Sequence, residues 1–242
     1  MGFALGVAAA GSARAEEACR FVTLGSATVR AVSQDGILLE DGRTLSPAGI
    51  ELAQAADLPA GTTLTLKRLG TGGETDRYGR RKAHVFTAEN GVERWLQADW
   101  VARGLARVSS RVGDPACARL LLASEQAARE AKLGLWGEAG YVIGKAEDPA
   151  GVLKERGRFA LVEGKVLSVR ESGGTIYVNF GRRWSEDFTV TIAKRNERVF
   201  AAAGLTPKSL NGRRVRIRGW IEERGGPWVE AARPEQIEVL GY

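Results

Sequence analysis

The sequence predicts a mainly β chain with a few helices, folded as two small barrel-like domains. Its 242 residues are enough for two domains of ordinary size. Short runs in which polar residues alternate with apolar or β-branched ones recur along the chain, whereas helical spacing is confined to a few segments. Hydrophobic residues make up 44% and charged residues 26%, a balance that excludes disordered and fibrous chains.

The first domain, expected over residues 20–140, opens with a meander of strands. Alternating patterns predict strands over residues 26–32, 36–40 and 44–50, with Asp41-Gly42 as the turn before the third. Further strands are expected over residues 62–66, 83–88 and 93–95, separated by glycine-rich turns. These strands are short enough to close into a barrel.

Two helices are expected to follow these strands. Apolar residues at helical spacing over 95–101 precede Gly104, a residue type that often ends a helix. Asp114-Pro115 is typical of a helix start and predicts a helix through residue 131. Its buried face should carry residues 117, 120, 121, 124, 127, 128 and 131. Trp95, Trp100 and Trp136 are interpreted as core residues because of their spacing.

A linker is expected over residues 141–153, where little pattern remains, and a second domain over residues 154–242. The second domain shows strand patterns at 159–169, 175–180 and 188–192, then a helical pattern at 195–203. Strand patterns follow at 213–221, 228–231 and 236–240. Three strands, a helix and two or three strands is the order of a five-stranded oligonucleotide/oligosaccharide-binding (OB) β-barrel.

The N-terminal segment is interpreted as a signal peptide over residues 1–15. An apolar run over residues 2–10 precedes Ala13-Arg-Ala15, a pattern typical of a cleavage site, so a periplasmic or secreted location is expected. Positive residues are missing before the apolar run, as expected if the natural start lies upstream of Met1. The alternative is an N-terminal tail with no targeting role.

The two cysteines, Cys19 and Cys117, suggest one disulfide in an exported chain. The alternative is two unpaired cysteines that pack as small apolar residues. No stretch approaches the roughly 20 apolar residues of a membrane-spanning helix, so no membrane span is expected.

Charge and histidine content narrow the possible chemistry. The formal net charge of +6 favours anionic partners, although a solubilising surface explains it equally well. A single histidine excludes histidine-cluster metal sites and most histidine-based triads, so any catalysis must use carboxylates and arginines. That histidine, His84, is expected to be a half-buried strand residue.

Three segments together resemble the staphylococcal-nuclease (thermonuclease) family. They are Asp76-Arg-Tyr-Gly-Arg80, the segment from Trp95 to Arg107, and Ser124-Glu-Gln-Ala-Ala-Arg-Glu-Ala-Lys-Leu-Gly-Leu-Trp136. The resemblance covers about residues 26–136. It implies an OB-type barrel capped by helices and, in active members, calcium-dependent cleavage of DNA and RNA.

The resemblance also implies roles for individual residues, and two of them are degenerate. Arg80 matches a phosphate-binding arginine, and Asp35 and Glu51 match the two calcium-binding carboxylates. The family's second arginine falls on Ser46, and its general-base glutamate falls on Gln54, whose amide cannot accept a proton near neutral pH. A shifted alignment offers Arg43 as the arginine, but its spacing turns it to the other face of the strand.

The second domain offers cations and aromatic residues for nucleic-acid contacts. Alternation places Arg214, Arg216 and Arg218 on one face of a strand, where they would form a basic outer surface. A turn carries Arg182, Arg183 and Trp184, and Tyr177, Phe180 and Trp228 lie nearby in the sequence; Trp184 and Trp228 are the strongest candidates for an exposed contact. The alternative is an ordinary amphipathic strand with solvated arginines.

The sequence therefore predicts an exported thermonuclease-family protein with an incomplete nuclease site that needs no cofactor and acts as a nucleic-acid-binding or interaction module. One alternative is an active nuclease that holds Ca²⁺ at Asp35 and Glu51. Another is an envelope adaptor with a protein or glycan partner. The oligomeric state stays open.

Overall fold

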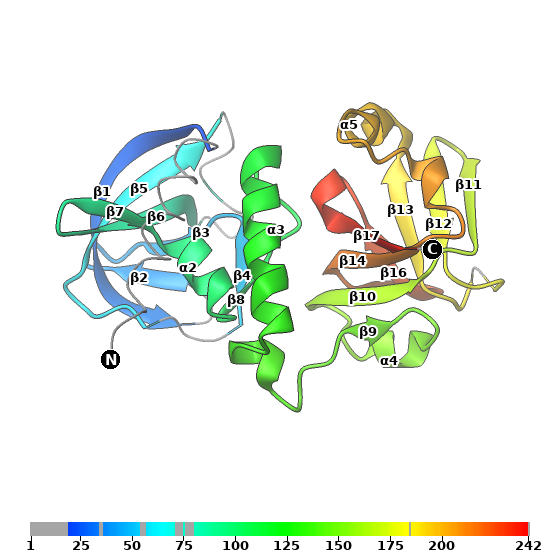
Figure 1. Cartoon of the computed structure of the whole chain (residues 1–242), viewed down its shortest axis with the longest axis horizontal. Coiled ribbons are helices and arrows are strands. Elements are labelled where there is room, and N and C mark those ends of the chain that lie inside the picture. The colour runs from blue at the N-terminus through cyan, green and yellow to red at the C-terminus, as the bar shows by residue number, and fades with distance from the viewer. Residues whose placement is uncertain are drawn as a thin grey trace. The chain divides into compact units, whose positions relative to one another are not determined.

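The computed structural model describes residues 19–33, 36–53, 57–70, 75, 80–183 and 185–241 (Figure 1). The chain divides into two compact units, Met1–Tyr141 and Val142–Tyr242, and each is described by itself. The signal peptide expected at residues 1–15 lies outside the described residues. Within the described ranges, none of the helices combines the length and the apolar character needed to cross a bilayer.

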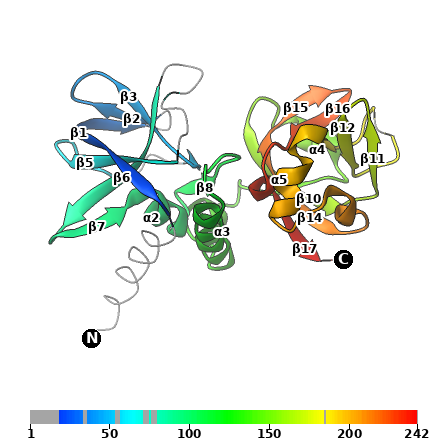
Figure 2. The same cartoon turned by 90° about the horizontal axis from the view of Figure 1, so that it is seen from above.

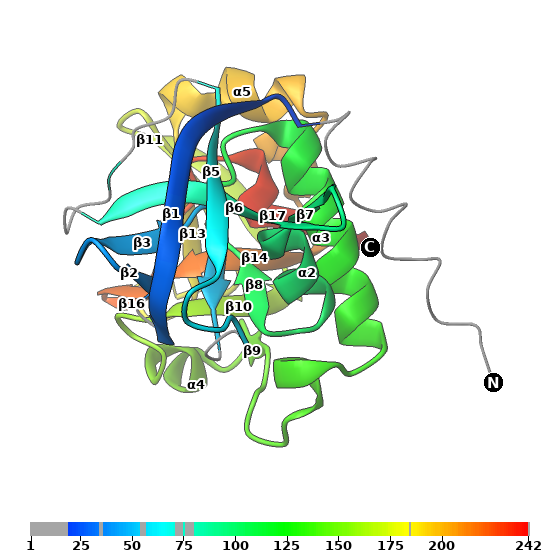
Figure 3. The ribbon, with the colours of Figure 1, turned by 90° about the vertical axis from the view of Figure 1, so that its left-hand side faces the viewer.

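The first unit is built on a closed β-barrel. Its strands pair in the order β3-β2-β1-β5-β6, and a parallel pairing of β3 with β6 closes the ring. The hairpin strand β7 extends the sheet beyond β6 (Figure 2), and Figure 3 shows β1 running alongside β5. The bounds are β1 (Phe21–Ser33), β2 (Gly36–Leu39), β3 (Thr44–Pro47), β5 (Thr63–Leu69), β6 (Arg81–Glu89) and β7 (Val92–Trp95).

The single strand expected over residues 44–50 is wrong, because the chain turns after Pro47. Gly49 adopts a φ of 79°, a left-handed conformation that glycine reaches without strain. The chain then forms a separate strand, β4 (Ile50–Leu52), which pairs with β8 (Ala106–Val108) in a two-stranded sheet. This turn removes Glu51 from the barrel wall and places it beside β8.

The described part of this unit also contains the helices α2 (Leu96–Ala102) and α3 (Pro115–Glu130) and a 3₁₀ turn over Gly134–Gly137. The Asp114 carboxylate accepts hydrogen bonds from the backbone N–H groups of Ala116 and Cys117, so the expected helix start is confirmed. After α2, a Cβ at Gly104 would lie 2.1 Å from the Leu133 carbonyl oxygen. The two turns thus pack backbone against backbone, which only a glycine permits.

The buried face of α3 differs from the expected one. Cys117, Leu121 and Ala128 are buried, but Ala127 and Ala131 are exposed. Glu125 is fully buried instead. The sequence correctly predicts a helix here. Its buried face was not fully predictable, because an acidic residue such as Glu125 is rarely buried.

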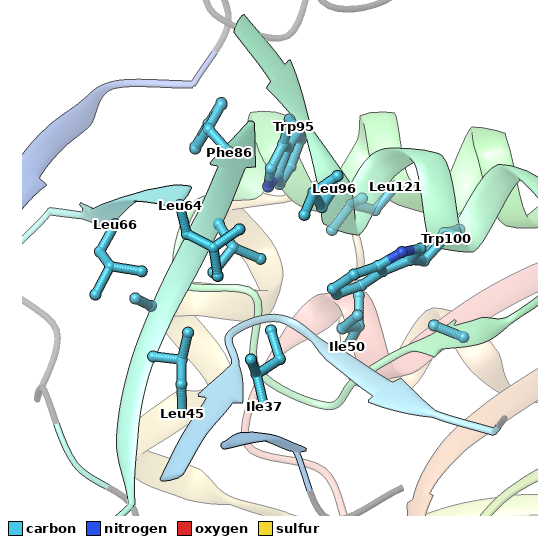
Figure 4. Close-up of a cluster of buried hydrophobic side chains, with 14 of the residues drawn as sticks. Ile37, Leu45, Ile50, Leu64, Leu66, Phe86, Trp95, Leu96, Trp100 and Leu121 are labelled. Atoms are coloured by element: carbon cyan, nitrogen blue, oxygen red, sulfur yellow. The ribbon is translucent and has the colours of Figure 1, made fainter. Parts of the chain in front are cut away.

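The barrel core is apolar and continuous with the inner face of the helices (Figure 4). Strands β2 to β5 supply Ile37, Leu45, Ile50, Leu64 and Leu66; the end of β7 supplies Trp95, and helices α2 and α3 supply Leu96, Trp100 and Leu121. Trp95 and Trp100 are buried as expected, and Trp136 is half-buried. The sulfurs of Cys19 and Cys117 are bonded, with their Cα atoms 5.4 Å apart, so the start of β1 is tied to α3.

The second unit contains a four-stranded sheet, β17-β14-β10-β9, and a five-stranded sheet, β11-β12-β13-β16-β15. The strands are β9 (Gly144–Lys145), β10 (Phe159–Lys165), β11 (Ser168–Ser172), β12 (Thr175–Asn179), β13 (Thr189–Ala193), β14 (Arg214–Trp220), β15 (Glu222–Arg224), β16 (Gly226–Glu230) and β17 (Ile237–Gly241). The helices are α4 (Pro149–Leu153) and α5 (Glu197–Ala202), with 3₁₀ turns over Lys194–Asn196, Pro207–Leu210 and Pro234–Gln236.

The pairings of the second unit are consistent with an OB-like barrel. β12 pairs with β11 and with β13 in antiparallel fashion, β13 pairs with β16 in parallel, and β14 pairs with β10. Helix α5 follows β13, the position expected for the helix. Residues 144–153, within the segment expected to be a linker, form β9 and α4; β9 pairs with β10.

Candidate functional site

Glu51 and Arg107 are paired residues of the two-stranded sheet in the first unit. The register of β4 and β8 places them directly opposite each other. The Ala53 N–H donates to the Leu105 carbonyl and the Ser109 N–H donates to the Gly49 carbonyl, both at 3.0 Å. Opposing side chains of an antiparallel pair lie on the same face with Cβ atoms roughly 5 Å apart. The Glu51 carboxylate and the Arg107 guanidinium are therefore neighbours.

Lys82 lies beside Ser46 on the neighbouring strand. The parallel register of β3 and β6 pairs Ser46 with Lys82, and pairs Leu45 with Arg81 one residue earlier. Residues in register share a face of the sheet, whereas successive residues alternate. Ser46 and Lys82 are half-buried, while Leu45 is fully buried in the barrel. Lys82 thus occupies the same face as Ser46, and Arg81 the opposite one.

Arg80 directly precedes β6 and is half-buried. The Glu51 carboxylate experiences the charges of Arg107, Lys82 and Arg80, in that order of strength. One carboxylate and three cations therefore gather in this region, called the Glu51 cluster below.

The pKa of Glu51 is raised above its ordinary value. Burial of the carboxyl is the largest cause, because it disfavours the charged form. The charges of Arg107, Lys82 and Arg80 act in the opposite direction and lower the pKa, but they do not outweigh burial. The carboxylate is thus poorly solvated, even with three cations around it.

Arg107 reaches this place because Glu125 holds β8. The buried Glu125 carboxylate accepts a hydrogen bond of 2.6 Å from the Val108 N–H and forms an ion pair of 2.7 Å with Arg129. Arg107 donates to the Tyr141 hydroxyl at 3.4 Å, and its guanidinium lies 5.6 Å from the centre of the Tyr141 ring. These contacts orient a cation that the sequence analysis did not assign to the site.

The sequence pattern indicates the strand that carries Arg107, but not the partner of that strand. Gly104 follows α2 closely, and the pattern over residues 106–109 is typical of a short strand, which the structure shows as β8 (Ala106–Val108). The sequence pattern does not identify the partner of β8, because it predicts a single strand over residues 44–50 and not the separate strand β4. Without that pairing, nothing connects position 107 with position 51.

Two of the expected site residues, Asp35 and Gln54, lie outside the described residues. The described part of the chain holds no group of three or more histidine, cysteine, aspartate or glutamate residues arranged to bind a metal. Calcium prefers six to eight oxygen ligands, with carboxylates prominent among them. Within the described residues, a single desolvated carboxylate among three cations does not fit that preference.

His84 belongs to the core and not to the Glu51 cluster. Its side chain is buried, not half-buried as expected, and its ring packs edge-on against Phe21 and Trp95 at centroid distances of 5.2 Å and 5.4 Å. Burial lowers the pKa of His84 to about 3. The imidazole is therefore neutral near pH 7 and has a packing role.

In the second unit, the basic outer surface expected from β14 is largely absent. Arg216 lies opposite Glu163 on β10 and Glu238 on β17, and it bonds to both, at 2.7 Å and 3.2 Å. The Arg218 side chain is fully buried and also pairs with Glu238. Only Arg214, 51% exposed, keeps the expected exposure. Neighbouring carboxylates take up the charges of Arg216 and Arg218, so these two side chains are poorly placed to contact phosphates.

The other residues expected to contact nucleic acid in this unit differ in their exposure. Arg182 and Arg183 are exposed, and Arg183 pairs with Glu186 at 2.9 Å. Trp184 lies outside the described residues. Phe180 is buried against Phe188, so its expected contact role is wrong. Trp228 is half-buried and packs edge-on with Tyr177, while Arg224 lies over its ring.

Comparison with known protein families identifies part of the first unit. The family model described as staphylococcal nuclease homologue matches residues 53–138. No curated protein matches the chain. Arg80, Arg107 and Gln54 lie inside the matched segment, whereas Asp35, Ser46 and Glu51 precede it. The match confirms the resemblance drawn from the sequence motifs: over residues 53–138, the first unit is similar to staphylococcal nuclease homologues.

Proposed function

We propose that the first unit binds the phosphate backbone of nucleic acids at the Glu51 cluster and is at most a weak nuclease. The gathering of Arg80, Lys82 and Arg107 around one carboxylate supports this function most strongly. Among the described residues, three cations against one carboxylate give a net positive charge, which attracts the polyanionic backbone of DNA or RNA. The match to the nuclease family makes nucleic acid the first ligand to test.

The residues at positions 46 and 54 argue against efficient cleavage. Ser46 replaces an arginine of the family pattern, and loss of one charge-stabilising donor typically costs about 10²–10³-fold in rate. Gln54 replaces the general base, whose contribution is typically about 10²–10⁴-fold. Together these losses remove most of the rate acceleration that a nuclease of this type requires.

Binding is tested with the full chain and a fluorescently labelled single-stranded oligonucleotide, without metal. We expect the logarithm of affinity to fall linearly with the logarithm of salt concentration, with a slope of about −1.4 to −2 for two or three phosphate contacts. Arg80→Ala should weaken binding and flatten this slope. Arg43→Ala is the matched control, because Arg43 is exposed and its charge is paired with Asp41.

Binding and cleavage assays on the same protein distinguish nucleic-acid binding from an adaptor role and from nuclease activity. No binding at low salt refutes the proposal and favours an adaptor with a protein or glycan partner. Rapid oligonucleotide cleavage that requires Ca²⁺, is blocked by a chelator and is lost in Arg80→Ala refutes it in favour of an active nuclease. Binding without rapid cleavage, with or without Ca²⁺, supports it.

We further propose that the protein is exported to the periplasm or secreted. The bond between Cys19 and Cys117 supports an oxidising compartment, and the apolar segment before Ala15 supports processing by a signal peptidase. Cell fractionation and the intact mass of the native protein test this proposal. An unprocessed chain that stays in the cytoplasm with two reduced thiols contradicts it.

A further inference from the structure

The three cations of the Glu51 cluster do not have equivalent surroundings. Arg107 lies opposite Glu51 and also contacts Tyr141 through its guanidinium. Its charge is the strongest of the three at the Glu51 carboxylate. Arg107 is therefore engaged with residues of its own domain, and its main effect is to offset the charge of Glu51.

Lys82 has a different environment. It is half-buried, and no carboxylate of the described residues forms an ion pair with it. Its ammonium is close enough to Glu51 to influence the carboxyl, but less strongly than Arg107 does. A long flexible side chain with three donors, and with no ion-pair partner among the described residues, is well suited to bind an external anion.

The register of the barrel gives Lys82 its position. Lys82 lies beside Ser46 on the same face of the β3–β6 pair. A cation that is missing at position 46 is thus present one strand away. In the same register, Arg81 pairs with the fully buried Leu45, so its side chain starts from the other face.

We propose that Lys82 is a principal phosphate-contacting cation of this site together with Arg80, in place of a cation at position 46, while Arg107 offsets the charge of Glu51. This inference rests on the proposed function and names residues that would carry it. The ligand is an internal phosphodiester of single-stranded nucleic acid, contacted by the Lys82 ammonium as a point charge and by the Arg80 guanidinium. The Ser46 hydroxyl is a neighbouring hydrogen-bond donor.

The test uses the full-length wild type, four full-length variants and one labelled oligonucleotide of thymidine at about 50 mM salt. Lys82→Ser should weaken binding about five- to tenfold and reduce the salt slope by about 0.7, the loss expected for one phosphate contact. Arg81→Ser removes the same charge from the other face and should change affinity less than about twofold, within the range of a screened surface charge. Lys82→Arg keeps the charge and should keep most of the affinity.

The double variant Ser46→Arg/Lys82→Ser moves the cation back by one strand and should recover most of the lost affinity. Equal losses in Lys82→Ser and Arg81→Ser would overturn the inference and leave the proposed function standing, because the wild type still binds. A double variant that binds no better than Lys82→Ser would also overturn it. No binding by the wild type refutes the proposed function and this inference together.

Discussion

Glu51 and Arg107 face each other across the antiparallel pair of β4 and β8. The pKa of Glu51 is nevertheless raised, because burial outweighs the charges of Arg107, Lys82 and Arg80. For a carboxyl whose pKa is higher in the folded state, the stabilising contribution is present at pH values below the unfolded pKa. It is lost as the pH rises through the folded pKa.

Glu51→Gln should therefore raise the free energy of unfolding at pH 7 relative to wild type, and the difference should vanish below about pH 4, where the unfolded carboxyl is protonated.

Removing the negative charge of Glu51 should also tighten oligonucleotide binding on the order of fivefold, as expected for about 1 kcal/mol between unit charges in water. Urea unfolding and fluorescence anisotropy measure the two effects. The control is Glu40→Gln at an exposed turn; weaker binding by Glu51→Gln would contradict this account.

His84 should make stability depend on pH in the opposite direction. Its pKa in the folded protein is about 3, because burial disfavours the imidazolium, so the unfolded chain binds the extra proton first. The stabilisation by neutral His84 is present above about pH 6.5 and is lost as the pH falls toward 3, by up to roughly 1.4 kcal/mol per pH unit. His84→Phe should flatten this part of the profile in urea unfolding between pH 5 and 8. Profiles that run parallel for the two proteins would show that His84 does not titrate in this way.

Glu125→Ala should destabilise the first unit strongly. The buried carboxylate bonds to the Val108 N–H and to Arg129, and its loss leaves a nearly buried guanidinium without that partner. Breaking a buried ion pair by removing one partner typically costs about 3–5 kcal/mol. Gln126→Ala, at the exposed neighbouring position, should cost less than about 1 kcal/mol. Equal unfolding midpoints for the two variants would disprove the anchoring role of Glu125.

Glu238→Gln should destabilise the second unit without changing oligonucleotide affinity. Glu238 pairs with Arg216 and with the fully buried Arg218, so the variant leaves buried positive charge poorly compensated. The expected cost is about 3–5 kcal/mol, read from urea unfolding, whereas Arg214→Ala, at a 51% exposed side chain, should cost less than about 1 kcal/mol. A large loss of oligonucleotide affinity in Glu238→Gln at a temperature where it remains folded would restore a binding role for this strand.

Features with local causes were predictable from the sequence. Asp114 and Pro115 predict the start of α3, because the Asp114 carboxylate accepts hydrogen bonds from the first turn and Pro115 has a fixed φ suited to a helix. Alternation located most strands of both units, since one face of each strand is buried. The motif residues around Gly104 and Leu133 indicated the nuclease-like domain because their backbone packing admits only a narrow set of residues.

Features that depend on pairing between distant segments required the tertiary structure. The amino-acid sequence shows Arg80, Arg107 and Glu51, a hydroxyl side chain at position 46, an amide at position 54, and the alternating pattern of residues 214–220. Only the fold decided that Arg107 lies opposite Glu51, that Lys82 lies beside Ser46, and that Glu163 and Glu238 pair with the arginines of β14. The physical reason is that strand register is set by contacts far apart in the chain, and alternation alone cannot tell a solvated arginine from a paired one.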